Sequence, residues 1–311
     1  MKELIQRECG PWHQGEIRIQ QRAGSRKRME HIGSKFIRSY MPDQHRLFFQ
    51  QLPMIILGAA DLSGDIWASV LFGEPGFITS PDERTLVIRT ELPICDPVLG
   101  QLQVGSRVGL LGIEFSTKRR NRMNGLISSM TDNDMVIVVE QSYGNCPQYI
   151  QTKTAGINPY YGDFSRRDFT NLDQTDRTLI QNADTFFIAS GFNSDNEDRA
   201  SGFDVSHRGG ETGFVQMDER GRLLVPDYPG NGFYNTLGNL EMNPHAGLLF
   251  LDFELGSALH LLVTIEILWL EGRSKYDGDS DRYGNANRLL RMTINGGCRI
   301  VNRLQCLFEP A

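Results

Sequence analysis

Apolar and polar positions alternate in short runs along this 311-residue chain, and such runs predict β-strands rather than long helices. Residues 54–60 are almost wholly apolar, a polar turn follows at 61–64, and residues 66–72 form a second apolar run, so the pair predicts a β-hairpin. Further strands are expected at 77–78, 86–89, 108–115 and 135–141. Gly, Pro and Asp separate these runs, which is typical of a mainly β fold, a barrel or a sandwich.

The second part of the chain shows the same kind of pattern. A helix is expected at 176–183, and the last strand begins at 289 and continues towards 304, after a polar insertion at 275–287. The strands expected between them are 186–189, 200–206, 214–215, 223–225, 247–253 and 259–269. Few helices interrupt the strands, so both parts are predicted to be β domains with flanking helices.

The first 43 residues predict an extension ahead of the strands. Met29, Ile32 and Phe36 follow helical spacing, and Pro42 ends that pattern. Asp43 is then expected to cap a short helix that stops before Pro53.

Two motifs occur twice, in the same order and with the same separation to within one residue. Residues 73–78 (Gly-Glu-Pro-Gly-Phe-Ile) match 210–215 (Gly-Glu-Thr-Gly-Phe-Val), and Gly-Leu-Leu at 109–111 matches 247–249. Short chance matches have no reason to keep both order and spacing, so a duplicated domain is predicted. The expected units are an extension at 1–43, a first domain at 44–150, a linker at 151–170 and a second domain at 171–311.

Composition and charge exclude several classes of protein. Apolar residues make up 40% and charged residues 23%, as in soluble globular proteins. The net charge of −6 argues against nucleic acid as the main partner, and the basic runs at 22–28 and 118–122 are interpreted as solvated faces or loops. No apolar stretch reaches the roughly 20 residues of a membrane span, and no secretory signal is visible. We therefore expect a cytoplasmic protein without a membrane partner.

Cysteine usage fits that location. The five cysteines are an odd number and include no Cys-x-x-Cys pair, so free thiols are expected, and Cys146 is interpreted as an inert one. The cysteines are Cys9, Cys95, Cys146, Cys298 and Cys306.

One segment has the composition of an anion-binding turn. After the strand ending at Val225, a turn rich in Pro, Gly and Asn leads into a short helix expected near 233–236, and the first N–H groups of a helix stabilise an anion. Upstream, Ser206, His207 and Arg208 add a hydroxyl, an imidazole and a guanidinium. The matching stretch of the first domain is apolar after Ser69. The alternative is an ordinary Asn/Gly turn with a helix cap, and the residues alone leave both interpretations open.

These residues resemble a known family. Residues 204–210 and 213–215, followed by 226–228, 235–239 and 243–250, are similar to the pyridoxamine 5′-phosphate oxidase-like family of FMN-binding split barrels. The tandem subgroup is suggested by residues 109–115, 118–125 and 144–150. The resemblance implies two tandem six-stranded antiparallel split barrels with FMN held at an interface between barrels.

The resemblance also implies a set of FMN-binding residues. They are Ser206, His207, Arg208, Pro226, Asp227, Tyr228, Asn231, Asn235 and Thr236. The basic pair that grips the flavin phosphate in the oxidase falls on Asn235 and Thr236, so Arg208 and backbone amides would have to compensate. This departure argues against the oxidase reaction itself more than against FMN binding.

The function implied is an FMN-binding flavoprotein, an oxidoreductase acting on a small molecule with NAD(P)H or another electron donor. Homodimerisation is expected, because split barrels leave sheet edges and apolar faces to be covered. Two alternatives remain: a non-catalytic flavin or haem binding protein acting as a carrier or redox sensor, and a nucleic-acid module using residues 118–122. No residue is assigned a catalytic or metal-binding role.

Overall fold

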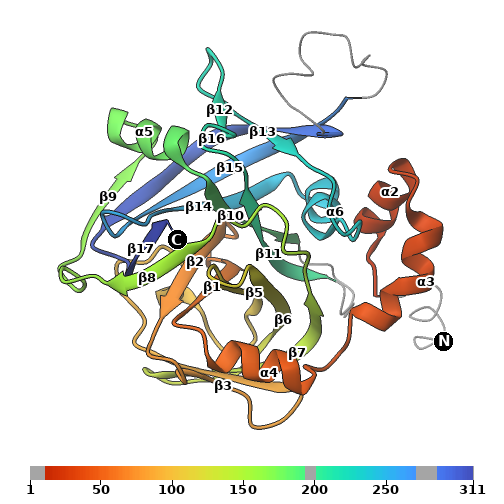
Figure 1. Cartoon of the computed structure of the whole chain (residues 1–311), viewed down its shortest axis with the longest axis horizontal. Helices are drawn as coiled ribbons and strands as arrows, with labels where there is room; N and C mark the ends of the chain where they lie inside the picture. Colours follow the sequence, from red (N-terminus) through yellow and green to blue (C-terminus); the bar gives the residue numbers. More distant parts are fainter. Residues whose placement is uncertain (1–10, 193–200, 271–285, 311) are drawn as a thin grey trace.

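The computed structural model, which describes residues 11–192, 201–270 and 286–310, is built around two large antiparallel β-sheets (Figure 1). The fold is mainly β, as the short apolar runs predict. Among the described residues, no helix is long and apolar enough to cross a membrane. Cys9, the beginning of the strand expected at 200–206 and most of the insertion expected at 275–287 lie outside the described residues.

The first sheet contains seven strands. They are β1 (Met54–Ala60), β2 (Ile66–Phe72), β3 (Ile78–Thr79), β4 (Thr85–Arg89), β5 (Arg107–Glu114), β6 (Arg119–Met130) and β7 (Asp134–Gly144). The second sheet contains β9 (Ser165–Phe169), β10 (Thr185–Phe192), β11 (Gly202–Gly209), β12 (Gln216–Met217), β13 (Leu223–Asp227), β14 (His245–Asp252), β15 (Ser257–Trp269) and β16 (Arg288–Val301). A separate ribbon pairs β8 (Lys153–Ile157) with β17 (Cys306–Pro310).

The two sheets have the same strand order. The first runs β2-β1-β5-β6-β7-β4-β3 and the second runs β11-β10-β14-β15-β16-β13-β12, so each strand of one has a counterpart of the same rank in the other. The end strands do not pair with each other in the described chain, so hydrogen bonds close neither sheet into a barrel. The expected count of six strands is exceeded by one in each path, because the two-residue strands β3 and β12 extend the edges. The split-barrel geometry and the duplication stay predictions.

Helices flank the two sheets. They are α2 (Gln14–Arg22), α3 (Arg26–Phe36), α4 (Asp43–Gln50), α5 (Gln174–Asn182), α6 (Asn235–Met242) and the short 3-10 helix η1 (Leu99–Gln101). α4 precedes β1 as α5 precedes β10, which extends the parallel between the halves.

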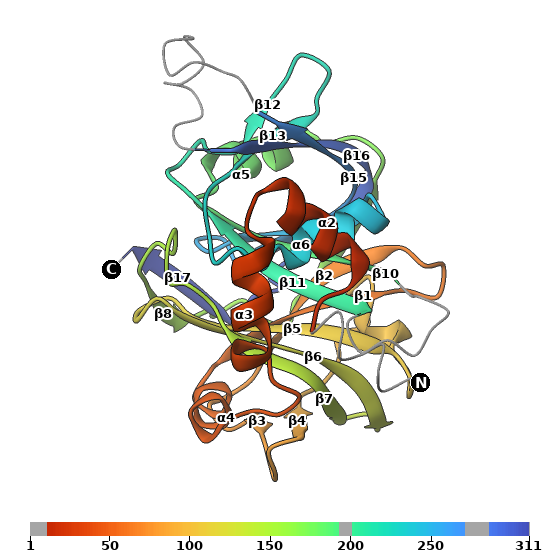
Figure 2. The same cartoon turned by 90° about the vertical axis from the view of Figure 1, so that its right-hand side faces the viewer.

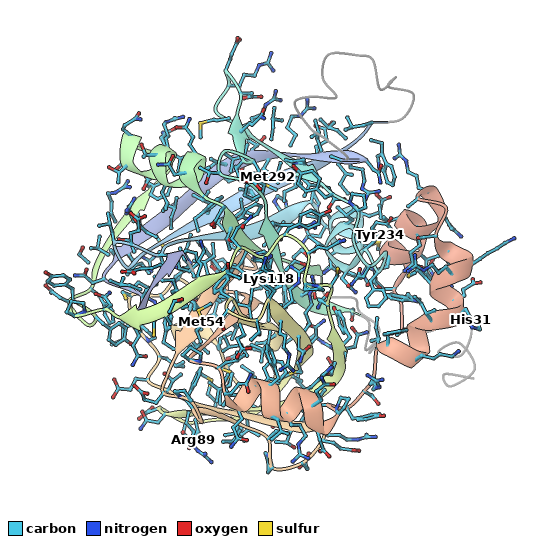
Figure 3. The ribbon with its side chains drawn as sticks, viewed as in Figure 1. His31, Met54, Arg89, Lys118, Tyr234 and Met292 are labelled. Atoms are coloured by element: carbon cyan, nitrogen blue, oxygen red, sulfur yellow. The ribbon has the colours of Figure 1, made fainter. Side chains whose placement is uncertain are left out.

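The segment at 118–122 is not the solvated face that its charge suggested. It begins β6, in which Asn121 and Met123 are buried and Arg120 and Arg122 are half-buried. Lys118, in the left-handed turn before this strand, is exposed (Figure 3). The basic residues did not suggest a strand from sequence, because Arg120 and Arg122 face the other half of the molecule instead of solvent. The expected linker, similarly, contains β8 and β9.

The described chain has four buried clusters, of which one lies around the amino-terminal helices and three lie within and between the sheets. Each half has its own, and a third joins them with residues such as Ile56 and Leu111 from the first sheet and Phe187 and Leu249 from the second. An apolar sheet face that a second copy was expected to cover is therefore covered within the chain. Homodimerisation stays a prediction.

The amino-terminal helices dock beside the second half. In Figure 2, α2 lies over α6, and Gly15 of α2 approaches Gly238 so closely that a Cβ on Gly15 would lie 2.1 Å from the Gly238 carbonyl oxygen. The Gln20 amide donates to the Phe233 carbonyl at 3.2 Å, just ahead of α6. The amino-terminal extension thus packs against residues 233–238, the segment in which the anion site was predicted.

Candidate functional site

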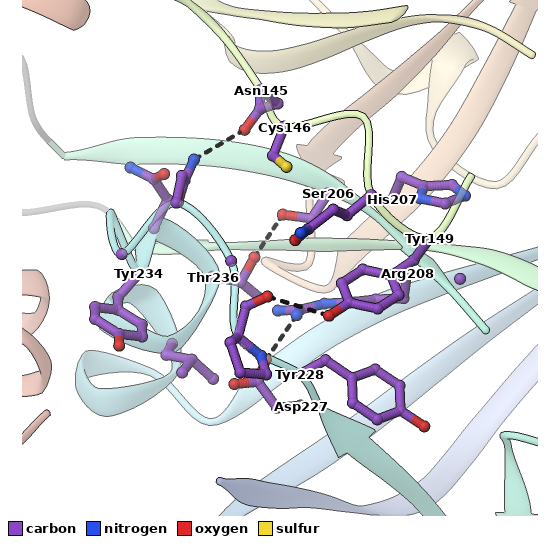
Figure 4. A pocket seen from close by; sticks show the side chains of 18 of the residues that line it. Asn145, Cys146, Tyr149, Ser206, His207, Arg208, Asp227, Tyr228, Tyr234 and Thr236 are labelled. Atoms are coloured by element: carbon purple, nitrogen blue, oxygen red, sulfur yellow. Dashed lines mark hydrogen bonds and ion pairs between the residues drawn. The ribbon is translucent and has the colours of Figure 1, made fainter. Parts of the chain in front are cut away.

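A cleft with a volume of about 120 Å³ opens between the two halves (Figure 4). β11, the end of β13, the following turn and the start of α6 line it from the second half, and β6 and the segment after β7 line it from the first. All nine residues expected to bind the cofactor lie around this one cleft: Ser206, His207, Arg208, Pro226, Asp227, Tyr228, Asn231, Asn235 and Thr236. Their assignment to FMN remains a prediction.

Arg208 is already engaged on one side. Its Nη1 donates to Asp227 Oδ1 at 2.7 Å, and the other carboxylate oxygen accepts from Arg288 Nε at 2.9 Å. The buried Asp227 carboxylate therefore holds two guanidinium groups. The Nε of Arg208 is buried without a hydrogen-bond partner, so part of its fork is still available to a ligand.

Arg122 crosses from the first half and organises the floor of the cleft. Its Nη1 lies 3.0 and 2.9 Å from the two oxygens of Asp204, and its Nη2 donates to Ser206 Oγ at 2.6 Å. Burial is the largest single influence and lowers the pKa of this guanidinium, but Asp204 and Tyr143 together outweigh it and the pKa is raised. Arg122 is thus a permanent cation that joins the halves.

Arg120, two residues earlier, lacks such a partner. Its Nε donates to the Cys146 carbonyl at 2.8 Å, and no carboxylate pairs with it in the described chain. Burial, and then the neighbouring charge of Arg122, lower the pKa of Arg120 to about 10, so the group remains charged at neutral pH. A half-buried cation without a counter-ion favours the binding of an anion.

The geometry fixes the tautomer of His207. Arg120 Nη1 lies 2.9 Å from His207 Nδ1, and because a guanidinium only donates, Nδ1 accepts and Nε2 carries the proton. Burial, and then the charges of Arg120 and Arg208, hold the pKa of His207 well below its usual range. His207 is therefore neutral and positions Arg120 rather than exchanging protons.

The start of α6 is open. Tyr234, the residue before the helix, has a left-handed φ of 63°, and no side chain caps the helix. Thr236 in the first turn lies with its Oγ1 2.6 Å from Ser206 Oγ, and Asn235 donates to Glu16 Oε1 at 2.6 Å. The first N–H groups of the helix thus remain available beside a serine and a threonine hydroxyl.

An aromatic wall closes one side of the cleft. Tyr149 of the first half stacks on Tyr228 of the second, with ring centroids 5.2 Å apart and planes inclined by 23°. The close approach of the halves here requires Gly209, because a Cβ at that position would lie 2.1 Å from the Tyr149 carbonyl oxygen. The wall offers a planar apolar surface next to a cationic floor.

The predicted set lacked every first-half residue of the cleft and one of its arginines from the second half. These residues are Arg120, Arg122, Asn145, Cys146, Gln148 and Tyr149, together with Arg288 from β16. Two of the segments that carry the family resemblance, 118–125 and 144–150, contain the six first-half residues and were the available signal. The alternation of Arg120 and Arg122 within a strand would have placed both on one face.

Buried histidines predict a loss of stability in mild acid. Burial, and then the charges of Arg38 and Arg119, lower the pKa of His45 to about 4, and burial also lowers the pKa of His207 and His260. An unfolded histidine titrates near pH ~6.5, so the unfolded chain takes up protons that the folded chain refuses. The stabilisation is full above about pH 6.5 and declines as the pH falls towards about 4.

Urea unfolding at about pH 7.5 and about pH 5 measures this loss. His45→Gln is expected to reduce the difference between the two pH values, whereas the same change at the exposed His31 leaves it unaltered. Equal stability of the unaltered protein at both pH values would contradict the prediction.

A scan against protein-family models finds no match, and neither does a search of curated proteins. Among solved structures, a putative pyridoxamine 5′-phosphate oxidase from Lactobacillus delbrueckii is similar at 14% identity over 42% of this chain and 93% of that one, with a TM-score of 0.30. An FMN-binding protein from Syntrophomonas wolfei is similar at 10% identity over 39% of this chain and 95% of that one, with a TM-score of 0.25.

A third similar structure, from Clostridium acetobutylicum, is described as related to general stress protein 26 of B. subtilis and as belonging to the pyridoxinephosphate oxidase family. It is 14% identical over 43% of this chain and 90% of that one, with a TM-score of 0.25. Similarity at this level assigns no family. The function proposed below therefore rests on the residues of the cleft.

Proposed function

We propose that the cleft binds FMN and that the protein is a flavoprotein acting as an oxidoreductase on a small molecule. One observation carries the proposal: buried N–H donors without partners belong to residues that line the same cleft as the uncapped start of a helix. These donors are Arg208 Nε, Arg122 Nε and Asn145 Nδ2. A buried donor without an acceptor is costly, so a ligand rich in acceptors is favoured here.

The charge of the cleft fits a phosphate monoester. Four arginines meet there, Arg120, Arg122, Arg208 and Arg288, against the carboxylates of Asp204 and Asp227. The phosphate would be held by Arg208, the hydroxyl of Thr236 and the first amides of α6. These contacts would replace those of the basic pair in the oxidase, since Asn235 and Thr236 stand at the positions of that pair in this chain.

The rest of the cleft fits a planar ring system. Tyr228 and Tyr149 would flank the flavin ring with an aromatic surface, and their own pKa values are raised, first by burial, so both hydroxyls stay protonated at neutral pH and remain donors. Bound FMN would supply the electron or hydride transfer, and the residues of this chain would bind and orient it.

Haem is a weaker candidate for the same cleft. His207 is the one histidine that lines it in the described chain, and its Nδ1 already accepts from Arg120 while the side chain is only 5% exposed. Axial ligation would require breaking this contact. A flavin carrier without turnover differs from an enzyme only in activity, and NAD(P)H oxidation by the FMN-loaded protein with a panel of acceptors separates them.

Titration with FMN and with riboflavin, followed by flavin fluorescence, tests the proposal and the role of Arg208. Arg208→Ala is expected to weaken FMN binding about 10–100-fold, the worth of about 1.5–3 kcal/mol for a charged hydrogen bond, and to leave riboflavin binding unchanged. The fold should tolerate the change because Asp227 keeps Arg288.

Arg222→Ala is the matched control, since Arg222 pairs with Asp218 in a turn away from the cleft. It should change neither affinity. Absence of FMN binding by the unaltered protein would contradict the proposed function, and equal weakening of FMN and riboflavin by Arg208→Ala would contradict the phosphate assignment.

A further inference from the structure

The shared strand order defines a second place, in the first half, that corresponds to the cleft. Ser69 of β2 pairs with Leu57 of β1, which pairs with Leu110 of β5. Ser206 of β11 pairs with Ile188 of β10, which pairs with Leu248 of β14. The two serines therefore occupy the same position in the two sheets.

In each half, a residue of the opposite half contacts the strand that carries the serine. These two contacting residues also occupy equivalent positions in their own sheets. Arg122 of β6 pairs with Leu111, and His260 of β15 pairs with Leu249, the counterpart of Leu111. Arg122 contacts Ser206 across the contact between the halves, and the Nδ1 of His260 lies 2.9 Å from the Ala68 carbonyl oxygen, next to Ser69. The two places are thus built crosswise from both halves.

In the first half, however, the chain's own side chains occupy the position. Ser69 Oγ donates to the Asp96 carboxylate, and Asp96 Oδ1 accepts from the backbone N–H groups of Val98 and Leu99 at 3.1 Å each. Arg303 Nη2 lies 3.4 Å from Asp96 Oδ2. All the side chains of this group are buried, with Asp96 4% and Arg303 1% exposed.

Arg303 lies in the connection between β16 and β17, whereas Arg120 lies in β6, but each arginine contacts the corresponding backbone group of its site. Arg303 donates to the carbonyl of Val70, the residue after Ser69, and Arg120 lies 3.5 Å from the carbonyl of His207, the residue after Ser206. A serine hydroxyl, backbone amides and a guanidinium therefore surround a carboxylate in the first half, whereas the same three kinds of group face the open cleft in the second.

We infer that Asp96 is an internal anion, which occupies in the first half the position that the anionic group of the ligand takes in the cleft, with Arg303 as its counter-ion. Each chain therefore binds one FMN rather than two. The inference rests on the proposed function for the identity of the ligand. The occupation of the Ser69 position by Asp96 does not depend on it.

Chemical replacement of the carboxylate tests the inference. Asp96→Ala leaves a buried space lined by Ser69, two amides and Arg303, which formate fits, and Asp96→Asn keeps that space filled. Thermal unfolding is followed with sodium formate against sodium chloride at equal ionic strength. We expect a saturating rise in Tm of about 2–4 °C with formate for Asp96→Ala beyond that of the unaltered protein and of Asp96→Asn.

Adding Arg303→Ala to Asp96→Ala should abolish this extra rise, because the counter-ion of the formate is gone. A formate effect of equal size in all the variants would overturn the inference. If Asp96→Ala is insoluble, the yield of soluble protein refolded in formate against chloride replaces Tm, and equal yields would overturn it in the same way.

The stoichiometry of FMN provides the second measurement. A titration end point of one FMN per chain is expected, and two per chain would overturn the inference. Absence of FMN binding would instead overturn the proposed function, and the formate comparison would still decide whether Asp96 occupies an anion position.

Discussion

Arg122→Ala is expected to lower the free energy of unfolding by about 3–5 kcal/mol, the usual cost of removing one partner from a buried ion pair. The change leaves the carboxylate of Asp204, 3% exposed, with the Tyr143 hydroxyl at 3.0 Å as its main remaining donor. It also removes a donor from Ser206 and a direct link between the halves. Urea unfolding measures the loss.

Two further variants distinguish the stability contributed by the Arg122–Asp204 ion pair from the general effect of removing an arginine. Arg119→Ala removes the exposed neighbour that lies over Phe48 and is expected to cost about 1 kcal/mol or less. Asp204→Asn added to Arg122→Ala should recover part of the lost stability, because the unpaired buried charge is gone. A cost for Arg122→Ala no greater than that of Arg119→Ala would show that the pair contributes little.

Gly109→Ala is expected to destabilise the protein by about 3 kcal/mol, at the upper end of the usual cost of overpacking. A Cβ on Gly109 would lie 2.6 Å from the Phe203 carbonyl oxygen and 2.7 Å from the Asp204 Cα, both backbone atoms of β11 that cannot rotate away. The halves would have to separate, and FMN affinity should fall with stability because both halves line the cleft.

The strand correspondence supplies a replicate and a control for this prediction. A Cβ on Gly247 of β14 would lie 2.5 Å from the Ile66 carbonyl oxygen, in the matching way, so Gly247→Ala should be similarly costly. Gly100→Ala should be close to neutral, because a Cβ there meets nothing within 4 Å. Both unfolding curves and FMN titrations apply, and a harmless Gly109→Ala would argue against a tight contact between β5 and β11.

Local sequence patterns were sufficient to predict a strand where the residues of that segment alone determine its structure. The apolar runs predicted β1 and β2 at their observed bounds, since a strand buried on both faces needs no polar alternation. The same reasoning failed for β6, where long basic side chains masked a strand whose arginines face the other half.

The residues of the candidate site likewise fall into those that local sequence could predict and those that it could not. Its second-half residues lie close together in sequence, on β11 and on the turn before α6, and this allowed them to be selected as a group. Arg120, Arg122 and Tyr149 reach the cleft from strands and turns of the first half. Sequence could suggest that a partner domain helps to build the site but did not identify the side chains that do so.

The sequence by itself determined the β class of this chain and the polar segment that forms one side of the cleft, because strand periodicity, turn chemistry and helix starts depend on neighbouring residues. Tertiary structure decided which charges meet: Arg208 with Asp227, Arg122 with Asp204, and Asp96 with Arg303. Apart from Arg208 and Asp227, these partners are separated by more than 80 residues, and only the packing of one sheet on the other brings them within hydrogen-bonding distance.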